Sequence, residues 1–257
     1  MFKGLKSLFV TERPSNASAA SATGTVIAPD RDFVAVGDIH GCIELMEDKL
    51  ARIRAATGGG VPVVFVGDYI DRGPRSAQVL RRLFDMQNEN PEEIVCLKGN
   101  HELMMLNFID DPAGLGLRWL KFGGRDTLKS FGIKALGKRL DFDDALEAAN
   151  ALEEALPEGM QSWLRNLPLT WSSGNMYCVH AAMDPARLPH EQTDETLLWG
   201  IDTFLAQPRD DDINVVHGHT IVRAPMISAN RISIDTGAYD TGRLTAVGIT
   251  AGNANFL

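Results

Sequence analysis

The sequence has few of the features that mark disulfide-rich, nucleic-acid-binding or membrane-spanning proteins. It contains only three cysteines, Cys42, Cys96 and Cys178, with no CxxC pair, which argues against a disulfide framework and against a cysteine zinc site. Basic residues number 25 against 34 acidic ones, for a formal net charge of −9. Because nucleic-acid binding depends on clustered basic charge, we expect no nucleic-acid partner. No apolar run reaches the roughly 18–20 residues of a membrane span.

The composition is that of a globular protein, with 257 residues of which 44% are hydrophobic and 23% charged. A Ser/Ala/Thr/Pro-rich stretch reaches about Thr25 and has too little apolar content to pack. We therefore expect residues 1–27 to form a flexible arm and residues 28–257 to form one domain. The opening MFKGLKSLF allows weak association with a membrane surface but no stable insertion. The cysteine usage favours a cytoplasmic location.

From Asp32 onward, short β-rich runs alternate with stretches of helical periodicity. FVAVG, VPVVFVG and EIVCLKG are each followed by an expected helix, at Cys42 to about Ala56, at Ser76 to Met86 and from about Glu102. Near-continuous apolar strands in this pattern predict a parallel sheet buried on both faces. Residues 112–167 are predicted to be mostly helical, and residues 168–257 return to short strands. The sequence therefore predicts an α/β fold with helices outside and a second set of strands.

Polar side chains that suit chemistry follow five of these strands directly. In open α/β sheets, ligands bind beyond the carboxyl ends of the strands, so we expect these side chains to converge on one crevice. They are Asp38, His40, Asp68, Asp71, Asn100, His101, His180, His217 and His219.

This mixture of carboxylate, imidazole and amide groups suits a divalent ion such as Mn, Fe or Zn. Two side chains two residues apart in extended chain point the same way, so Asp38 and His40 can chelate one ion. Taken singly, each residue is more simply a helix cap or a hydrogen-bonded core residue. However, five of the six histidines lie at these strand ends, and only His190 lies elsewhere, in a polar segment expected at the surface.

Several of these residues stand in motifs that resemble the signature series of the phosphoprotein phosphatase (PPP) family of calcineurin-like metallophosphoesterases. The matching segments, from about residue 32 to residue 248, are Gly37-Asp38-Ile39-His40-Gly41, Gly67-Asp68-Tyr69-Ile70-Asp71-Arg72-Gly73, Gly99-Asn100-His101-Glu102, His180-Ala181 and Gly218-His219-Thr220. The Gly123-Gly124 to Thr127-Leu128 segment and Ile234 to Ala238 are more similar to bacterial and phage members. The resemblance implies a central β-sandwich of two mixed sheets flanked by helices.

The resemblance also implies a role for each residue of these motifs. Two divalent ions, with Mn²⁺ preferred and Fe or Zn as alternatives, would be bound by Asp38, His40, Asp68, Asn100, His180 and His219, with Asp68 bridging both ions. Asp71 would pair with His101, and Arg72 would bind a phosphate oxygen. His219 is preferred to His217 as the ligand because it lies between Gly218 and Thr220, so His217 is expected to be packed. A metal-bridging hydroxide would attack the phosphorus directly while His101 acts as general acid.

The leading interpretation is therefore a serine/threonine protein phosphatase, a hydrolase of phosphomonoesters whose substrates are phosphorylated proteins or small phosphoesters. The alternative is a hydrolase of dinucleoside polyphosphates on the same site. His40 and the Asp71-Arg72 pair favour the phosphatase, because the symmetric dinucleotide hydrolases differ at both motifs. A third interpretation is a catalytically silent phosphate-binding scaffold. One departure concerns Ile201, where small family members carry a second phosphate-binding arginine; Arg125, Arg187 and Arg209 are candidates to replace it.

Overall fold

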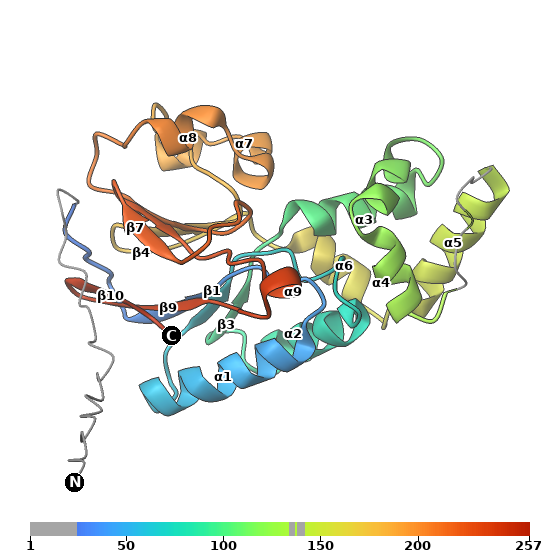
Figure 1. Cartoon of the computed structure of the whole chain (residues 1–257), viewed down its shortest axis with the longest axis horizontal. Coiled ribbons are helices and arrows are strands. Elements are labelled where there is room, and N and C mark those ends of the chain that lie inside the picture. Colours follow the sequence, from blue (N-terminus) through green and yellow to red (C-terminus); the bar gives the residue numbers. More distant parts are fainter. Residues whose placement is uncertain (1–24, 134–136, 138–141) are drawn as a thin grey trace, which may run out of the picture.

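The computed structural model describes residues 25–133, 137 and 142–257 (Figure 1). Most of the expected N-terminal arm, residues 1–27, lies outside these residues. Its described end is attached to the domain: the backbone N–H of Thr25 donates to the side-chain oxygen of Asn230, and that of Ala28 to the side-chain oxygen of Asn175, both at 2.9 Å.

The strands form two five-stranded sheets, with the orders β10-β9-β1-β2-β3 and β4-β5-β6-β8-β7. Their bounds are β1 Phe33–Val36, β2 Val63–Phe65, β3 Ile94–Cys96, β4 Thr170–Ser173, β5 Met176–Val179, β6 Asn214–His217, β7 Met226–Ser228, β8 Arg231–Ser233, β9 Ala246–Thr250 and β10 Asn253–Phe256. β1, β2 and β3 are parallel to one another, as are β5, β6 and β8, while the remaining pairs are antiparallel. Both sheets are therefore mixed.

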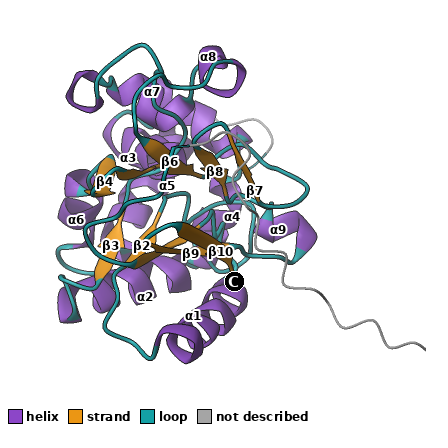
Figure 2. Ribbon diagram, turned by 90° about the vertical axis from the view of Figure 1, so that its left-hand side faces the viewer, coloured by secondary structure: helices purple, strands orange, loops and turns teal. Residues whose placement is uncertain are grey.

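Helices cover the outer face of each sheet, so that the layers run helix, sheet, sheet, helix (Figures 1 and 2). The α-helices are α1 Ile43–Thr57, α2 Ser76–Glu89, α3 Asn100–Asp110, α4 Gly124–Ser130, α5 Phe142–Ala155, α6 Met160–Asn166, α7 Asp194–Trp199, α8 Asp202–Ala206 and α9 Ala238–Thr241, and the 3-10 helices are η1 Leu115–Lys121 and η2 Pro189–Glu191. In Figure 1, α1 and α2 lie under the first sheet, α7 and α8 lie over the second, and α3 to α6 form a lobe at one side.

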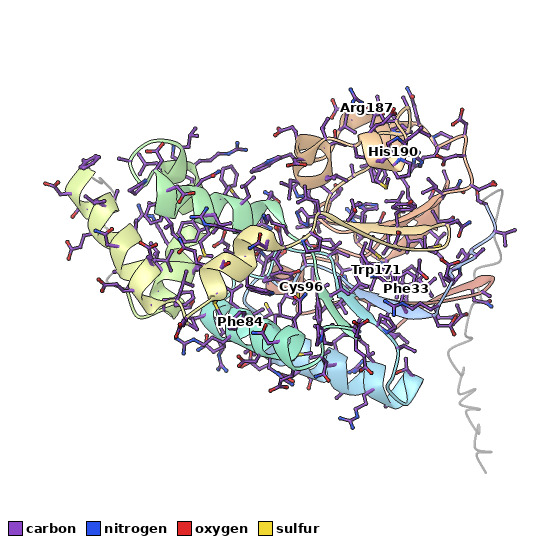
Figure 3. The ribbon with its side chains drawn as sticks, turned by 180° about the vertical axis from the view of Figure 1, so that it is seen from behind. Phe33, Phe84, Cys96, Trp171, Arg187 and His190 are labelled. Atoms are coloured by element: carbon purple, nitrogen blue, oxygen red, sulfur yellow. The ribbon has the colours of Figure 1, made fainter. Side chains whose placement is uncertain are left out.

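The period-two alternation of β1 divides its side chains between two apolar layers. Phe33 and Ala35 pack between the sheets, whereas Val34 and Val36 pack against the helices below. Phe33 meets Trp171 of the second sheet edge to face, with ring centroids 4.8 Å apart (Figure 3). This burial on both faces fixes the register of the strand, and with it the place where the strand ends.

The structure confirms the predicted fold class and the order of elements. The first three helices occur where the periodicity predicts them, and α3 begins at Asn100, two residues earlier than expected. Asn100 and His101 therefore lie in the first turn of a helix. The carboxyl ends of β1, β2, β3, β5 and β6 point to one edge of the sandwich, where the candidate site lies.

Candidate metal centre

Three nitrogen and oxygen atoms from separate strand ends lie close together on one side of the site. Nε2 of His180 lies 2.8 Å from Oδ1 of Asn100, and Nδ1 of His219 lies 3.1 Å from the same oxygen and 3.2 Å from Nε2 of His180. Oδ1 of Asp68 is 3.4 Å from Nε2 of His180. Asp68, His180 and His219 form a group whose ligand atoms lie within 4.8 Å of one another.

A second group of the same kind shares Asp68. Its other carboxylate oxygen, Oδ2, lies 3.6 Å from Nε2 of His40 and 3.8 Å from Nε2 of His101. Asp68, His40 and His101 again offer ligand atoms within 4.8 Å of one another. One oxygen of Asp68 faces each group, which is the arrangement that a carboxylate bridging two cations requires.

The histidines have the protonation state that metal ligands need. Nδ1 of His40 hydrogen-bonds to the carbonyl of Ile70 at 2.7 Å, and Nδ1 of His180 to the carbonyl of Val66 at 2.9 Å. These bonds assign the ring hydrogen to Nδ1 and leave the Nε2 lone pair directed into the site. Burial lowers the pKa of His40 to about 3 and that of His219 to about 4, and it also lowers the pKa of His180. All three rings are therefore neutral near pH 7.

The backbone is strained where it presents the site. Of the seven described non-glycine residues with a positive φ, five lie here, with values between 45° and 74°: His40, Asp68, Asp71, Arg72 and His219; the other two, Ala229 and Asn230, lie between β7 and β8. Each costs about 1 kcal/mol or more, and such conformations cluster where function requires them. A Cβ at Gly218 would overlap the carboxylate of Asp38, and one at Gly99 would overlap that of Asp68. The chain thus leaves room for both carboxylates, which a metal site requires.

His101 forms a buried pair with Asp71, as the sequence predicted. Its Nδ1 lies 2.5 Å from Oδ2 of Asp71, and that carboxylate also accepts hydrogen bonds from Nε1 of Trp119 at 2.8 Å and from Oγ1 of Thr127 at 2.6 Å. Burial lowers the pKa of His101, but the charges of Asp68 and Asp71 outweigh it and the pKa is raised overall. An imidazolium is therefore favoured here, in contrast to the neutral rings around it.

Arg72 lies beside the two histidines of the second group. Its Nη1 is 3.0 Å from Nε2 of His40, and its Nη2 is 3.2 Å from Nε2 of His101. The guanidinium is also stacked on Tyr239, with Cζ 4.9 Å from the ring centroid. This arrangement keeps a planar cation close to the candidate ligands, where it can meet an anion.

Several functional neighbours were missed by sequence reasoning. Glu102 is buried and accepts the backbone N–H groups of Asp68, Tyr69 and Gly99, which fixes the loop that carries Asp68. Asp235 is also buried; desolvation and the charge of Asp68 raise its pKa to about 6. Both lie in segments that carried the family resemblance, Glu102 as the fourth residue of the Gly99 motif and Asp235 within Ile234 to Ala238, but neither was assigned a role.

Other expected residues are placed differently from the candidate ligands. Asp38 is buried and accepts the backbone N–H of His219, but it belongs to neither three-residue group, so its role as a ligand with His40 stays a prediction. His217 packs away from the site, as expected: its Nε2 lies 2.8 Å from Oγ of Ser233. His190 is exposed on the outer side of the second sheet, also as expected (Figure 3).

The arginines considered as substitutes at position 201 make other contacts. Arg209 is buried and bonds to Asp211 and to the carbonyls of Asp184 and Arg187. Arg187 pairs with Asp184 at 3.5 Å. Arg125 donates to the carbonyl of Gly137 at 3.1 Å. None of these contacts brings a guanidinium to the metal centre.

Comparison with known proteins places this geometry in one class of enzyme. A family model described as calcineurin-like phosphoesterase matches residues 32–243, and the chain belongs to that family. It is 30% identical over 228 residues to serine/threonine-protein phosphatase 2 of Escherichia coli, covering 84% of this chain and 91% of that protein. It is 23% identical over 243 residues to the asymmetrical bis(5'-nucleosyl)-tetraphosphatase PrpE of Bacillus mycoides, covering 82% and 88%.

Solved structures agree with this assignment of the fold. A crystal structure whose assignment as a diadenosine tetraphosphatase is provisional superimposes with a TM-score of 0.63 at 20% identity, covering 91% of this chain and 97% of that chain. The protein is therefore a hydrolytic phosphoesterase with the calcineurin-like α/β fold. Members of the family use divalent metals, and the two His/Asp groups fit that use. Among the described residues no helix is long and apolar enough to cross a bilayer.

Proposed function

We propose that the protein is a metal-dependent serine/threonine protein phosphatase that hydrolyses phosphomonoesters. The observation that carries the proposal is the position of Asp68, whose two oxygens face two separate sets of histidines. Two divalent ions bound by Asp38, His40, Asp68, Asn100, His180 and His219 would activate water and neutralise charge on the phosphoryl group. The mixture of carboxylate, imidazole and amide donors suits Mn²⁺, which we propose as the bound metal, with Fe or Zn as alternatives.

His101 is proposed as the general acid. The Asp71 carboxylate fixes its Nδ1 and favours the charged ring, while Nε2 faces the same side as Nε2 of His40. From that atom the ring can give a proton to the departing alkoxide oxygen of phosphoserine or phosphothreonine. Such a leaving group needs protonation, because a free alkoxide is strongly basic.

Arg72 is proposed to bind the phosphoryl oxygens. Its side chain reaches both His40 and His101, so a phosphate bound to its planar fork would lie beside the acid. A bidentate Arg–phosphate contact fixes orientation as well as supplying charge. Stacking on Tyr239 restricts the guanidinium before substrate binds, which lowers the entropy cost of that contact.

A second candidate is hydrolysis of dinucleoside polyphosphates, favoured by the similarity to an asymmetrical bis(5'-nucleosyl)-tetraphosphatase over 82% of the chain. The same groups could cleave a phosphoanhydride. However, a phosphate leaving group is much less basic than an alkoxide, so the buried His101–Asp71 acid pair would contribute less to that reaction. This difference favours the phosphomonoesterase.

One experiment compares the two substrates directly. The metal-supplemented enzyme is assayed for kcat/KM on a phosphothreonine peptide and on diadenosine tetraphosphate, with EDTA-treated protein as control. Higher kcat/KM on the peptide supports the phosphatase, and a strong preference for the dinucleotide supports the alternative.

We also propose that residues 28–257 act as one catalytic domain in the cytoplasm, a setting suited to the three free cysteines.

A further inference from the structure

Arg118 is an exposed cation of η1 for which the described part of the chain provides no carboxylate partner. Its Cζ lies 4.5 Å from the ring centroid of Trp199 and 5.4 Å from that of Phe122. An arginine stacked by its face on aromatic rings keeps its in-plane N–H donors available. The ring contacts therefore restrict Arg118, and because its guanidinium makes no hydrogen bond within the described residues, its N–H donors are available to an anion.

The segment that carries Arg118 contacts the His101–Asp71 pair. Trp119, the neighbour of Arg118 in η1, donates its indole N–H to Asp71 at 2.8 Å. Two residues after η1, a Cβ at Gly123 would lie only 2.7 Å from the backbone nitrogen of Arg72. The segment that carries Arg118 thus packs directly against the loop of Asp71 and Arg72.

The helix that carries Trp199 is hydrogen-bonded to the residue that follows His180. Trp199 is the last residue of α7, and in this helix the carbonyl of Leu197 accepts the backbone N–H of Ala181 at 2.8 Å. Ala181 directly follows His180. Arg118 therefore connects two segments that flank the candidate metal centre. One is η1, which packs against the proposed acid pair, and the other is α7, which is bonded to the residue after the proposed ligand His180.

We propose that Arg118, held on Trp199, binds a second anionic group of the substrate, beyond the phosphoryl group that is hydrolysed. This inference rests on the proposed phosphoester hydrolysis and narrows its substrate class. Ile201, which is 37% exposed and lies two residues after Trp199, provides no charge beside this helix end. Arg118 and the stacked Arg72 then bind two different anionic groups of one substrate.

The second anion can come from either of two chemical sources, a distal phosphate of a polyphosphate or a carboxylate beside the phosphorylated residue of a peptide. The test uses Arg118→Met, which keeps an unbranched apolar stem against Trp199 and removes the guanidinium. Arg81→Met, at an exposed position of α2, is the matched control. Substrates are p-nitrophenyl phosphate, phosphothreonine peptides with acidic or neutral flanks, and diadenosine tetraphosphate.

For Arg118→Met we expect KM to rise and kcat/KM to fall by about tenfold or more on the acidic peptide, on the dinucleotide or on both, the size of a lost charge-assisted hydrogen bond. The loss should be at least about five times smaller on p-nitrophenyl phosphate and on the neutral peptide. The substrate on which kcat/KM falls, the acidic peptide or the dinucleotide, identifies the chemical source of the anion. Arg118→Lys should recover part of the loss, because it restores the charge without the planar fork.

Equal losses on all substrates, or no loss on any, would overturn the proposal. An equal loss with a lowered melting temperature would mean that Arg118 serves only packing. If the wild-type enzyme turns over none of these substrates, the proposed function fails, but calorimetric binding of diadenosine tetraphosphate still tests Arg118. Dissociation constants for the dinucleotide and for the acidic peptide that are the same in wild type, Arg118→Met and Arg81→Met would then reject it.

Discussion

Nδ1 of His101 lies 2.5 Å from Oδ2 of Asp71, with both side chains buried. The carboxylate is fixed by two further donors from residues far along the chain, Trp119 and Thr127. His101 cannot rotate without breaking this set, and its raised pKa favours the charged ring. The neighbouring His40, with a pKa lowered to about 3, stays neutral. The surroundings thus favour opposite protonation states for two buried imidazoles whose ring centroids lie 4.8 Å apart, as an acid and a metal ligand need.

Replacing His101 by Asn should separate the acid role from metal binding. We expect kcat to fall by about 10²–10³ on an alkyl phosphate such as phosphothreonine, because the alkoxide then leaves without a proton. On p-nitrophenyl phosphate the fall should be less than about tenfold, since that leaving group scarcely needs a proton. Steady-state kinetics on the two substrates gives the ratio.

Metal binding by the same variant provides the control, because His101 also belongs to one of the two candidate groups. Mn²⁺ stoichiometry by calorimetry should match the wild type if the residue is only the acid. Equal kinetic losses on both substrates, together with a lost metal equivalent, would make His101 a ligand instead.

Thr127 is predicted to stabilise both the backbone and the carboxylate of Asp71. Its hydroxyl accepts the backbone N–H of Asp71 at 2.9 Å and donates to the carboxylate at 2.6 Å. Thr127→Val should lower the free energy of unfolding by about 1–3 kcal/mol, because it leaves buried polar groups without partners. Thr127→Ser keeps the hydroxyl and should cost about 1 kcal/mol for the lost methyl group. Urea denaturation measures both, and a larger loss in the serine variant would contradict this role.

Gly99 is predicted to be required for steric reasons alone. Its φ of −92° suits any residue, but a Cβ there would overlap the nitrogen and a carboxylate oxygen of Asp68. Gly99→Ala should therefore displace Asp68 and weaken Mn²⁺ binding by about tenfold or more, as expected when a supporting contact of a ligand is disturbed. Gly248→Ala, whose nearest neighbours lie at 3.8 and 4.0 Å, should bind normally. Similar affinity in both variants, measured by calorimetry, would count against the proposed role of Asp68.

The sequence allowed the convergence of the candidate ligands to be predicted because these residues end apolar strands, and strand ends meet at one edge whatever the details of the loops. The partners of Asp71 were not predictable in the same way. Trp119 and Thr127 lie 48 and 56 residues away and reach the carboxylate through a 3-10 helix and a short helix. Such contacts depend on how the helical lobe packs, and hydrophobic periodicity gives no information on that packing.

Strain in the backbone was also outside the reach of sequence patterns. Asp68 and His219 have φ angles of 54° and 62°, conformations that most residues avoid. Neighbouring glycines gave a signal of sharp turns, but not which non-glycine residue takes the left-handed conformation. Arg118 had no sequence signal at all, because its partner Trp199 lies 81 residues further along the chain and the two meet only in the folded protein.

Metal binding should become tighter as the pH rises from 6 to 8, and carboxylates should account for the change. Burial, followed by the charges of Asp235 and Asp68, raises the pKa of Asp38 well above its usual value, and the pKa of Asp235 is raised to about 6. A carboxyl group whose pKa is raised in the folded protein stabilises the metal-free fold when the pH is below its unfolded-state pKa. This contribution is lost as the pH rises through its folded-state pKa. His40 and His219, with pKa values of about 3 and 4, are already neutral at pH 6.

The increase in melting temperature caused by Mn²⁺ should therefore be larger at pH 8 than at pH 6, because at the lower pH the ion must displace protons from these carboxyl groups. Differential scanning calorimetry at fixed Mn²⁺ concentration measures the difference. In Asp235→Asn one negative charge beside Asp38 is removed, so the pKa of Asp38 should fall and the pH dependence should become weaker. A stabilisation that is equal at the two pH values, or larger at pH 6, would show that these carboxyl groups do not exchange protons for metal.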